Sequence, residues 1–361
     1  MVAARKTLRR LSLAGLGLLA LGAPALASSC AADFAPQSRV EGLRVLAVVA
    51  DDPYPAPGDT VTFKMTAFDG YVDPDHPDAS KRAFTITWLG GCFDPDGDEY
   101  YACYPQLADL FAGLSGGSLD PSLLQYVGLG DTFSLAIPDD IVTRRPKPAD
   151  GVDYYGSAYV FFAACAGTLK PVPTSDAGAA GSFPLGCFDE DGNQLGAESF
   201  VPGYTQVYTF DDGRKNKNPE VTGMTIGGKT LSETDPPKVK RCAASEDSRL
   251  AAPSCGKPSP TAACTSYDIS VKVPTDVAEA DPDGTTEDGK PLTEAVWVDY
   301  YAEKGDFDSD VQLVNDATNG YVKDHHVSYT PPPDKGAVRL WAVVHDARGG
   351  QTVIEREVLV E

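Results

Sequence analysis

The sequence predicts an all-β protein made of two antiparallel β-sandwich domains in tandem. Two observations support this fold class: polar and apolar residues alternate with period two in many short segments, and Pro- and Gly-rich turns separate these segments. A helical pattern occurs only around LADLF and PSLLQYV, in an insertion that follows the segment FTITW. The length of 361 residues suits about two domains, and 42% hydrophobic residues are enough for ordinary cores.

The first thirty residues have the pattern of an export signal. MVAARKTLRR is basic, and LSLAGLGLLALGAPALA is apolar but too short for a stable membrane span. We therefore expect residues 1–29 to be a cleaved signal peptide. Two cleavage sites fit the end of this segment: an A-x-A site at positions 25–27, and the lipobox-like ASSC at positions 27–30. We favour the second site, which makes Cys30 a lipidation site and residues 30–42 a tether.

The charge of the chain restricts its partners. Asp and Glu number 52 against 30 Lys and Arg, so the net charge is −22. A field of this sign repels phosphate backbones and anionic lipid surfaces. We therefore expect no nucleic-acid partner, and membrane contact through the lipid on Cys30. This places the exported protein in the cell envelope, anchored to the outer membrane on its periplasmic face or at the cell surface.

The first domain is expected over residues 43–213. In TVTFKMTAF the residues Val61, Phe63 and Met65 share one face, and FTITW places Trp88 in the same core with Thr87 in solvent. Before them, RVLAVVA is a β-branched strand segment. Three further strand segments complete this domain: TFSLAIP, YGSAYVFFAACAG and VYTF.

The second domain is expected over residues 218–361, because DDGRKNKNPE before it lacks apolar residues. An insertion rich in Pro, Ala and Ser interrupts it at 232–264. We expect Trp297 to occupy the core position that Trp88 has in the first domain, and the neighbouring His325 and His326 to be exposed on a strand. The strand segments are VTGMTI, YDISVKV, AVWVDYY, DVQLV, HHVSYT and the hairpin AVRLWAVVHDARGGQTVIEREVLV.

Part of the sequence resembles a known class of proteins. RVLAVVADDPYPAPGDTVTFKMTAFDG followed by ITWLGGC, behind a lipobox-like leader, resembles envelope lipoproteins of myxobacteria. The closing RLWAVVHDARGG resembles the last strands of bacterial Ig-like repeats. The resemblance implies an exported, Ig-like protein and no catalytic residue. It concerns architecture only, because TVTFKMTAF lacks the cysteine that joins strands B and F in many Ig domains.

One motif occurs twice: GCFDPDGDE at 91–99 returns as GCFDEDGNQ at 186–194. Alternate oxygen-bearing side chains are typical of calcium loops, since Ca²⁺ takes six to eight oxygen ligands. The candidate ligands are Asp94, Asp96, Asp98, Glu99, Asp189, Asp191 and Asn193. A complete EF-hand is excluded, because Glu99 and Pro105 stand where that loop needs Gly and Glu. The alternative is a pair of tight turns, for which Asp, Asn, Gly and Pro are the preferred residues. We favour turns, and calcium is the one cofactor that the sequence leaves open.

Eight cysteines in an exported chain predict disulfides. Four of them lie in the first domain and allow three connectivities. We expect the pairs Cys92–Cys103 and Cys165–Cys187, each closing an inserted loop. If Cys30 carries lipid, one of the last three cysteines stays unpaired, and the sequence does not select which. These three are Cys242, Cys255 and Cys264.

Three functions fit these patterns. The favoured one is a non-enzymatic cell-envelope lipoprotein that acts as a binding or structural module of unknown ligand. The second is a calcium-dependent adhesion or carbohydrate-binding protein that uses the acidic loops and the tyrosines beside them, Tyr100, Tyr101 and Tyr104. The third is a serine hydrolase with Ser115, because GLSGG at 113–117 satisfies G-x-S-x-G. That motif works at a sharp turn from a strand into a helix beside a parallel sheet, which an all-β chain does not offer.

Overall fold

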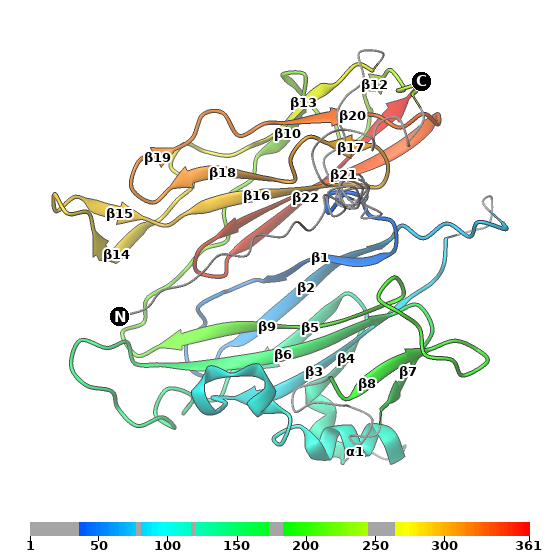
Figure 1. Cartoon of the computed structure of the whole chain (residues 1–361). Coiled ribbons are helices and arrows are strands. Elements are labelled where there is room, and N and C mark those ends of the chain that lie inside the picture. Colours follow the sequence, from blue (N-terminus) through cyan, green and yellow to red (C-terminus); the bar gives the residue numbers. More distant parts are fainter. Residues whose placement is uncertain (1–35, 77–80, 117–119, 173–182, 245–263) are drawn as a thin grey trace, which may run out of the picture.

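The computed structural model describes residues 36–76, 81–116, 120–172, 183–244 and 264–361, and these form a stack of mainly antiparallel sheets (Figure 1). The predicted all-β fold with two sandwiches is confirmed. The proposed signal peptide and Cys30 lie outside the described residues. Among the residues that are described, no helix combines the length and the apolar character that a membrane crossing requires.

In the first sandwich the sheet β1-β2-β5 faces the sheet β4-β3-β6-β9, and neighbouring strands are antiparallel throughout. The expected alternation is present, with Val61, Phe63 and Trp88 each fully buried between the two sheets. The strands are β1 (Leu43–Ala50), β2 (Thr60–Asp69), β3 (Thr85–Phe93), β4 (Val127–Leu129), β5 (Thr132–Ala136), β6 (Tyr155–Cys165) and β9 (Phe200–Phe210).

The second sandwich repeats this connectivity. Its sheets are β11-β10-β13-β20-β17 and β12-β22-β21-β16-β18-β19. Each sandwich has seven main strands, once the short strands β11, β12, β17 and β19 of the second are left aside. In both, the first, second and fifth main strands form one sheet, and the third, fourth, sixth and seventh form the other, as in Ig-like folds. The long strands are β10 (Gly223–Ile226), β13 (Tyr267–Lys272), β16 (Val296–Ala302), β18 (Val311–Asp316), β20 (Val327–Thr330), β21 (Gly336–Asp346) and β22 (Gln351–Val360). The short strands are β11 (Lys229–Thr230), β12 (Lys238–Val239), β14 (Ala280–Thr285), β15 (Pro291–Thr293), β17 (Asp306–Phe307) and β19 (Gly320–Tyr321).

The prediction for Trp297 is wrong. On β16 the side chains of Val296, Val298 and Tyr300 point into the core, and Tyr300 is fully buried there. Trp297 therefore has the opposite phase, lies on the outer face of the sheet and stacks on His345 with ring centroids 5.2 Å apart. The segment AVWVDYY carries apolar residues in both phases, so alternation alone does not select the inward face.

The prediction for His325 is also wrong. Strand β20 begins after it, at Val327, and the His325 side chain is 4% exposed. Its ring nitrogens lie 2.8 Å from the carbonyl oxygen of Val322 and 3.2 Å from that of Val271. His326 is exposed, as expected, and its ring pairs with Asp324.

An insertion covers the outer face of the β3-β6 sheet, so these two strands are buried on both sides. Leu89 and Phe161 contact Leu107 and Leu110 from the insertion, and all four side chains are at most 2% exposed. Thr87 was expected in solvent and is buried for this reason. The insertion has two parts. The part between β3 and β4 consists of α1 (Ala108–Gly116) and the 3₁₀ turns η1 (Asp96–Asp98), η2 (Tyr100–Cys103) and η3 (Pro121–Tyr126). The part between β6 and β9 is the hairpin of β7 (Thr168–Pro171) and β8 (Leu185–Phe188). Figure 1 shows it on the side of the first sandwich away from the second.

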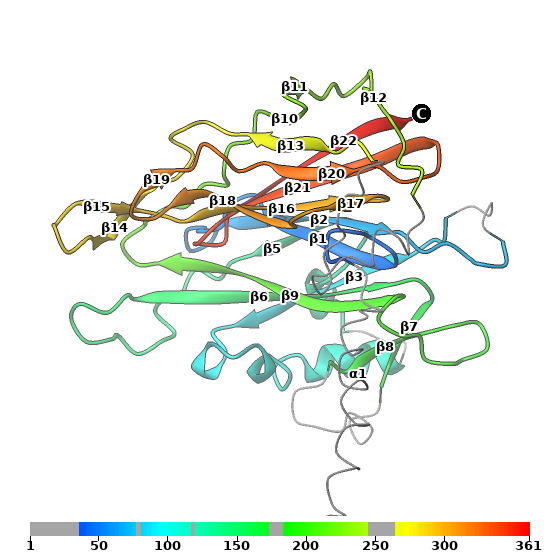
Figure 2. The ribbon, with the colours of Figure 1, turned by 45° about the horizontal axis from the view of Figure 1, so that its top comes forward.

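The two sandwiches pack face to face, with β1 and β2 next to β21 and β22 (Figure 2). We call the apolar contact between them the seam. Phe68 of the first sandwich lies against Trp341 of the second with ring centroids 4.9 Å apart, and Leu46 and Val343 are buried beside them. Trp341 is 1% exposed. The outer face of each central sheet is therefore buried by the other sandwich.

Two segments also tie the sandwiches together by hydrogen bonds. Residues 38–40, which the sequence assigned to a tether, form a strap along the end of β16: the Val40 amide donates to the Ala302 carbonyl (3.0 Å) and the Ala302 amide donates to that of Ser38 (2.8 Å). In the linker, the Asn218 amide group donates to the carbonyl of Ala50 in β1 (2.8 Å) and its oxygen accepts from Gln351 in β22 (2.9 Å).

The Trp341→Ala variant should lower the free energy of unfolding by about 3–5 kcal/mol, because it leaves a large cavity in the seam. Chemical denaturation measures this loss, and limited proteolysis should cut the linker at 213–218 faster in the variant. The control is Trp297→Ala, which truncates the same residue type on the outer face and should cost about 1 kcal/mol. An equal loss in both variants would contradict the seam as a main source of stability.

Candidate functional site

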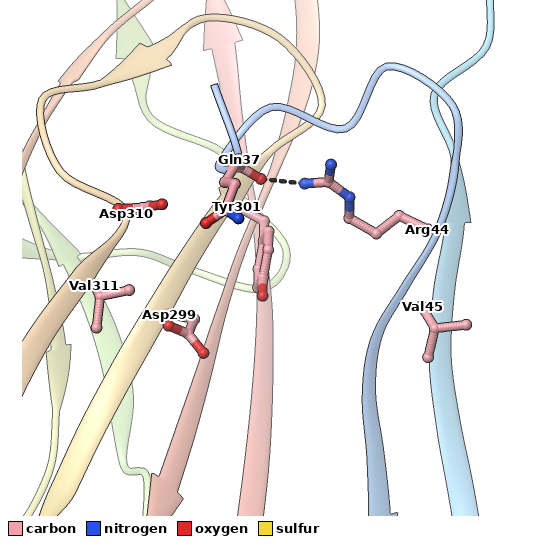
Figure 3. A pocket seen from close by; sticks show the side chains of 7 residues that line it. All are labelled: Gln37, Arg44, Val45, Asp299, Tyr301, Asp310 and Val311. Atoms are coloured by element: carbon pink, nitrogen blue, oxygen red, sulfur yellow. Dashed lines mark hydrogen bonds between the residues drawn. The ribbon is translucent and has the colours of Figure 1, made fainter. Parts of the chain in front are cut away.

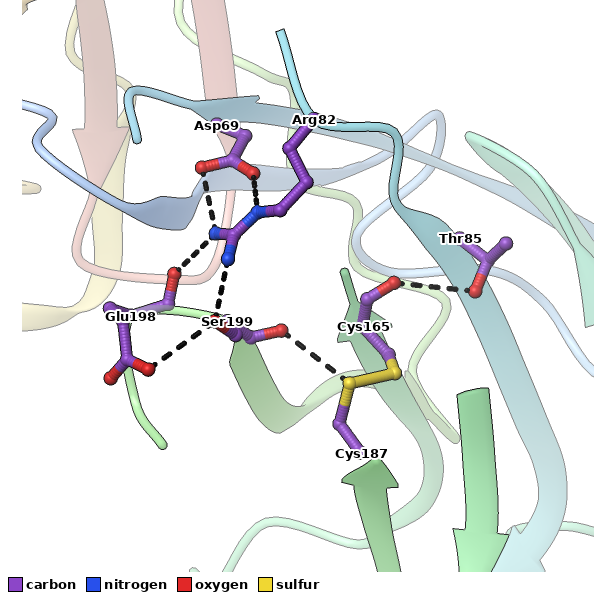
Figure 4. Close-up of a disulfide and its surroundings, with 7 residues drawn as sticks. All are labelled: Asp69, Arg82, Thr85, Cys165, Cys187, Glu198 and Ser199. Atoms are coloured by element: carbon purple, nitrogen blue, oxygen red, sulfur yellow. Dashed lines mark hydrogen bonds and ion pairs between the residues drawn. A yellow bond between two sulfur atoms is a disulfide. The ribbon is translucent and has the colours of Figure 1, made fainter. Parts of the chain in front are cut away.

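Each copy of the GCF motif lies at the end of a strand, and the cysteine of each copy forms a disulfide. Cys92 at the end of β3 is bonded to Cys103 in η2, and Cys187 in β8 is bonded to Cys165 at the end of β6. Figure 4 shows the second bridge beside Ser199, whose carbonyl oxygen lies 3.7 Å from the Cys187 sulfur. In the chain-entropy model, loops of this length gain roughly 3 kcal/mol per bridge.

A third disulfide joins Cys242 to Cys264. Cys30 and Cys255 remain, and both lie outside the described residues. Disulfides form and persist in oxidising compartments, so the protein is an exported one, extracellular or in the envelope.

In the first copy of the motif, two aspartates adopt an unusual backbone conformation. Asp94 has φ 48° and Asp98 has φ 55°, and among the described residues they alone combine a positive φ with a residue other than Gly. Asp tolerates this left-handed region better than most residues, at a cost of about 1–3 kcal/mol for each strained position. The surrounding structure has to supply contacts that hold the loop in this form.

Arg145 supplies these contacts. Its Nε donates to Asp94 Oδ1 (2.7 Å), its Nη1 donates to Asp98 Oδ2 (2.9 Å), and Nη2 donates to Asp98 Oδ1. Ser157 on β6 donates its backbone amide to Asp94 Oδ1 (2.8 Å) and its hydroxyl to Asp98 Oδ1 (2.9 Å). The Tyr155 hydroxyl donates to Asp98 Oδ2 (2.8 Å). The acidic loop is thus closed over a guanidinium of its own chain.

The electrostatics of the loop follow from this arrangement. The hydrogen bonds from Arg145 lower the pKa of Asp98 to about 2, against an ordinary value of 3.8, and those from Tyr155 and Ser157 act in the same direction. Hydrogen bonds from the two carboxylates raise the pKa of Arg145. Burial raises the pKa of the Tyr155 hydroxyl, and so does its bond to Asp98. All of these groups therefore keep their ordinary charges at neutral pH.

The second copy of the motif is a local turn. The Asn193 backbone amide donates to Asp189 Oδ1 (2.7 Å), and the Asn193 side-chain amide donates to Asp189 Oδ2 (3.0 Å). These bonds lower the pKa of the Asp189 carboxyl. Asp191 is exposed. Asp and Asn perform here the turn-forming role for which they are preferred.

The hydrogen bonds of the two copies bear on the calcium alternative. In the first, both oxygens of Asp98 accept hydrogen bonds from Arg145, and only Asp94 Oδ2 is buried without a hydrogen-bond partner. Over the whole described part of the chain, no three His, Cys, Asp or Glu side chains converge on a point that could hold a metal. This geometry agrees with the turns that we favoured, and calcium binding stays a prediction for its seven candidate ligands, which are Asp94, Asp96, Asp98, Glu99, Asp189, Asp191 and Asn193.

An aromatic surface continues from the acidic loop across β6 and β9. We call it the tyrosine face; its residues are Tyr100, Tyr101, Tyr155, Tyr159, Tyr204 and Tyr208. Tyr204 on β9 stacks on Tyr100 with ring centroids 4.8 Å apart and an interplanar angle of 16°. Tyr101 packs edge-on against Tyr100 at 5.6 Å. Tyr204 and Tyr101 are each 45% exposed, so aromatic area remains open to solvent beside the covered insertion.

The remaining candidate from the sequence, Ser115, does not lie at a turn between a strand and a helix. It is inside α1 (Ala108–Gly116), and a 3₁₀ turn rather than a strand precedes this helix. The structural context of a nucleophile elbow is therefore not present at Ser115.

Two functional features were missed by the sequence analysis. Arg145 is 51 residues from Asp94, in the segment TRRPKPAD, and nothing local marks it as the partner of the acidic loop. The tyrosine face left a signal in VPGYTQVYTF, where Tyr204, Tyr208 and Phe210 stand at even positions and therefore share one face of a strand.

Comparisons with known proteins add little. No family model matches the chain, and no curated protein matches it. Among solved structures it is similar to the D00-D0 domain of intimin (11% identity, TM-score 0.20, covering 89% of this chain and 98% of that one). It is also similar to fibronectin(III)-like modules of Clostridium thermocellum CbhA (8% identity, TM-score 0.18, 88% and 94%). A third is the C-terminal domain of the Streptococcus agalactiae AgI/II polypeptide BspA (10% identity, TM-score 0.20, 88% and 99%). TM-scores this low carry no argument, so the fold assignment rests on the strand order.

The Arg145–Asp98 pair should make stability depend on pH in the acid range. Because the folded-state pKa of Asp98 is depressed to about 2, its contribution is fully present above about pH 4 and is lost as the pH falls towards 2. We expect this loss to be about 1 kcal/mol, since the side chain is 25% exposed and solvent screens part of the interaction. Arg145→Gln should remove most of this pH dependence and cost about 3 kcal/mol at neutral pH.

Urea titrations of the wild type and the variant at several pH values between 2 and 7 measure both effects. Arg144→Gln is the matched control, because Arg144 is the adjacent residue and pairs with the exposed Asp140. It should leave stability and its pH dependence nearly unchanged. Identical pH profiles in wild type and Arg145→Gln would show that the acidic loop does not depend on this pair.

Proposed function

We propose that the protein is a non-enzymatic lipoprotein of the cell envelope that acts as a binding or structural module, of the kind that its leader and first strands resemble. The observation that carries this proposal is the seam. Two sandwiches that bury Phe68 and Trp341 against each other, and share a strap and a pinned linker, form a body suited to presenting surfaces in a constant arrangement.

The position of the strap fits an N-terminal lipid anchor. Residues 38–40 are held between the sandwiches, and Pro36 is already buried. The six residue steps from Cys30 to Pro36 span at most roughly 20 Å of extended chain. A lipid on Cys30 would therefore hold the seam side of the body close to the membrane surface, and the proposed role is display of the body itself.

The Cys30→Ser variant should move the protein from the membrane fraction to the soluble envelope fraction, and incorporation of labelled fatty acid should stop. The control is Cys255→Ser, since Cys30 and Cys255 are the two cysteines outside the three disulfides of the structure. It should remain in the membrane fraction. A wild-type protein that is already soluble and carries no fatty acid would overturn the lipid anchor and leave the A-x-A site as the cleavage signal.

A second candidate function, carbohydrate binding, is favoured by the tyrosine face. A tyrosine has an apolar ring face and a polar hydroxyl, so it suits sugars, which have apolar C–H faces and polar hydroxyl groups. The stacked pair Tyr100 and Tyr204 presents such rings, and Tyr204 is 45% exposed. This candidate does not need calcium, so it does not depend on a metal at the acidic loops.

Tyr204→Ala should weaken retention of the protein on immobilised cell-wall polysaccharide by about threefold to tenfold, the loss expected for one aromatic contact. Leu129→Ala is the control, because Leu129 is 76% exposed and lies outside the tyrosine face. It should bind as the wild type does. If the wild type shows no retention on any polysaccharide tested, the carbohydrate function is rejected.

A further inference from the structure

A cavity of about 360 Å³ lies between the two sandwiches, beside the seam (Figure 3). The first sandwich contributes Arg44 and Val45 of β1, and the strap contributes Gln37. The second sandwich contributes Asp299 and Tyr301 of β16, with Asp310 and Val311 at the start of β18. A volume of this size is within the range of small-ligand sites.

The wall formed by the second sandwich is acidic. Asp299 Oδ2 lies 2.9 Å from His345 Nε2 in a close contact that is not a hydrogen bond, and His345 is in turn stacked on Trp297. Asp310 projects into the cavity beside it (Figure 3). In the described part of the chain, no side chain pairs with the Asp310 carboxylate. This wall therefore offers an acceptor to a positively charged group.

The opposite wall is basic. Figure 3 shows Arg44 on β1 across the cavity from the two aspartates, with its guanidinium turned towards Gln37. One N–H of Arg44 donates to the Gln37 carbonyl oxygen. A guanidinium has five N–H donors in a planar fork, which matches the two oxygens of a carboxylate. Arg44 therefore has further N–H donors that a ligand in the cavity could use.

Tyr301 lies between the two walls. Burial raises its pKa to about 12, the charge of Asp299 adds to this effect, and that of Arg44 opposes it. The phenol therefore stays protonated and serves as a neutral donor midway between charges of opposite sign. Val45 and Val311 supply apolar surface on either side. The cavity is thus polarised from one wall to the other, with Tyr301 in the middle and one valine beside each wall.

We propose that this cavity binds a small zwitterion, with an ammonium group at Asp299 and Asp310 and a carboxylate at Arg44, joined by a short aliphatic chain. A ligand with both charges neutralises both walls, whereas a simple amine leaves Arg44 facing a second cation and a simple acid meets two carboxylates. Because the walls belong to different sandwiches, such a ligand also bridges the seam.

Calorimetric titration with ω-amino acids of increasing chain length tests the proposal, using 3-aminopropanoate, 5-aminopentanoate and 8-aminooctanoate as probes. Pentylamine and pentanoate each lack one charge and should bind at least about tenfold more weakly than the best ω-amino acid. Arg44→Gln should abolish the preference for 5-aminopentanoate over pentylamine. Asp310→Asn should abolish the preference for 5-aminopentanoate over pentanoate.

Two matched variants control for the change in net charge. Arg144→Gln and Asp334→Asn remove one charge of each sign from exposed positions away from the cavity, and both should bind like the wild type. Circular dichroism establishes that every variant is folded. The proposal is overturned if no ω-amino acid binds, if pentylamine or pentanoate binds as tightly as the best zwitterion, or if the Arg44 and Asp310 variants bind like their controls.

Discussion

Burial of two sheet faces against each other is the constraint on which the rest of this structure depends. A two-layer sandwich leaves the outer face of each sheet to solvent, and here one such face from each sandwich is apolar and packs at Phe68 and Trp341. The strap at residues 38–40 leads into β1 of the first sandwich and bonds to Ala302 of the second, and the linker residue Asn218 bonds to both sandwiches. Both arrangements require the two sandwiches to lie side by side. The cavity between Arg44 and Asp299 exists only in this arrangement.

The other outer face of the first sandwich is covered from within the same chain. Disulfides at Cys92 and Cys165 hold the insertion to the ends of β3 and β6, and Leu107 and Leu110 fill the space over the sheet. The first sandwich is thus covered on both sides, by its partner sandwich and by its own insertion. What stays accessible is the tyrosine face beside the insertion and the open side of the cavity.

A cation of the chain itself completes the acidic loop. Arg145 reaches Asp94 and Asp98 from a distant segment and provides the positive charge that carboxylates at alternate positions require. A guanidinium delivers directed N–H donors, whereas a hard metal ion would need six to eight oxygens around one point. The geometry of the loop therefore fits the fork of an arginine.

The sequence by itself determined the strands, the two-sandwich class and the export chemistry, because period two, turn residues and cysteines are local signals. It failed where a strand is apolar in both phases, as for Trp297, and where a covering segment decides burial, as for Thr87. Tertiary structure alone placed Arg145 at the acidic loop and Arg44 opposite Asp299. These pairings join residues far apart in the chain, and no periodicity records which distant faces will meet.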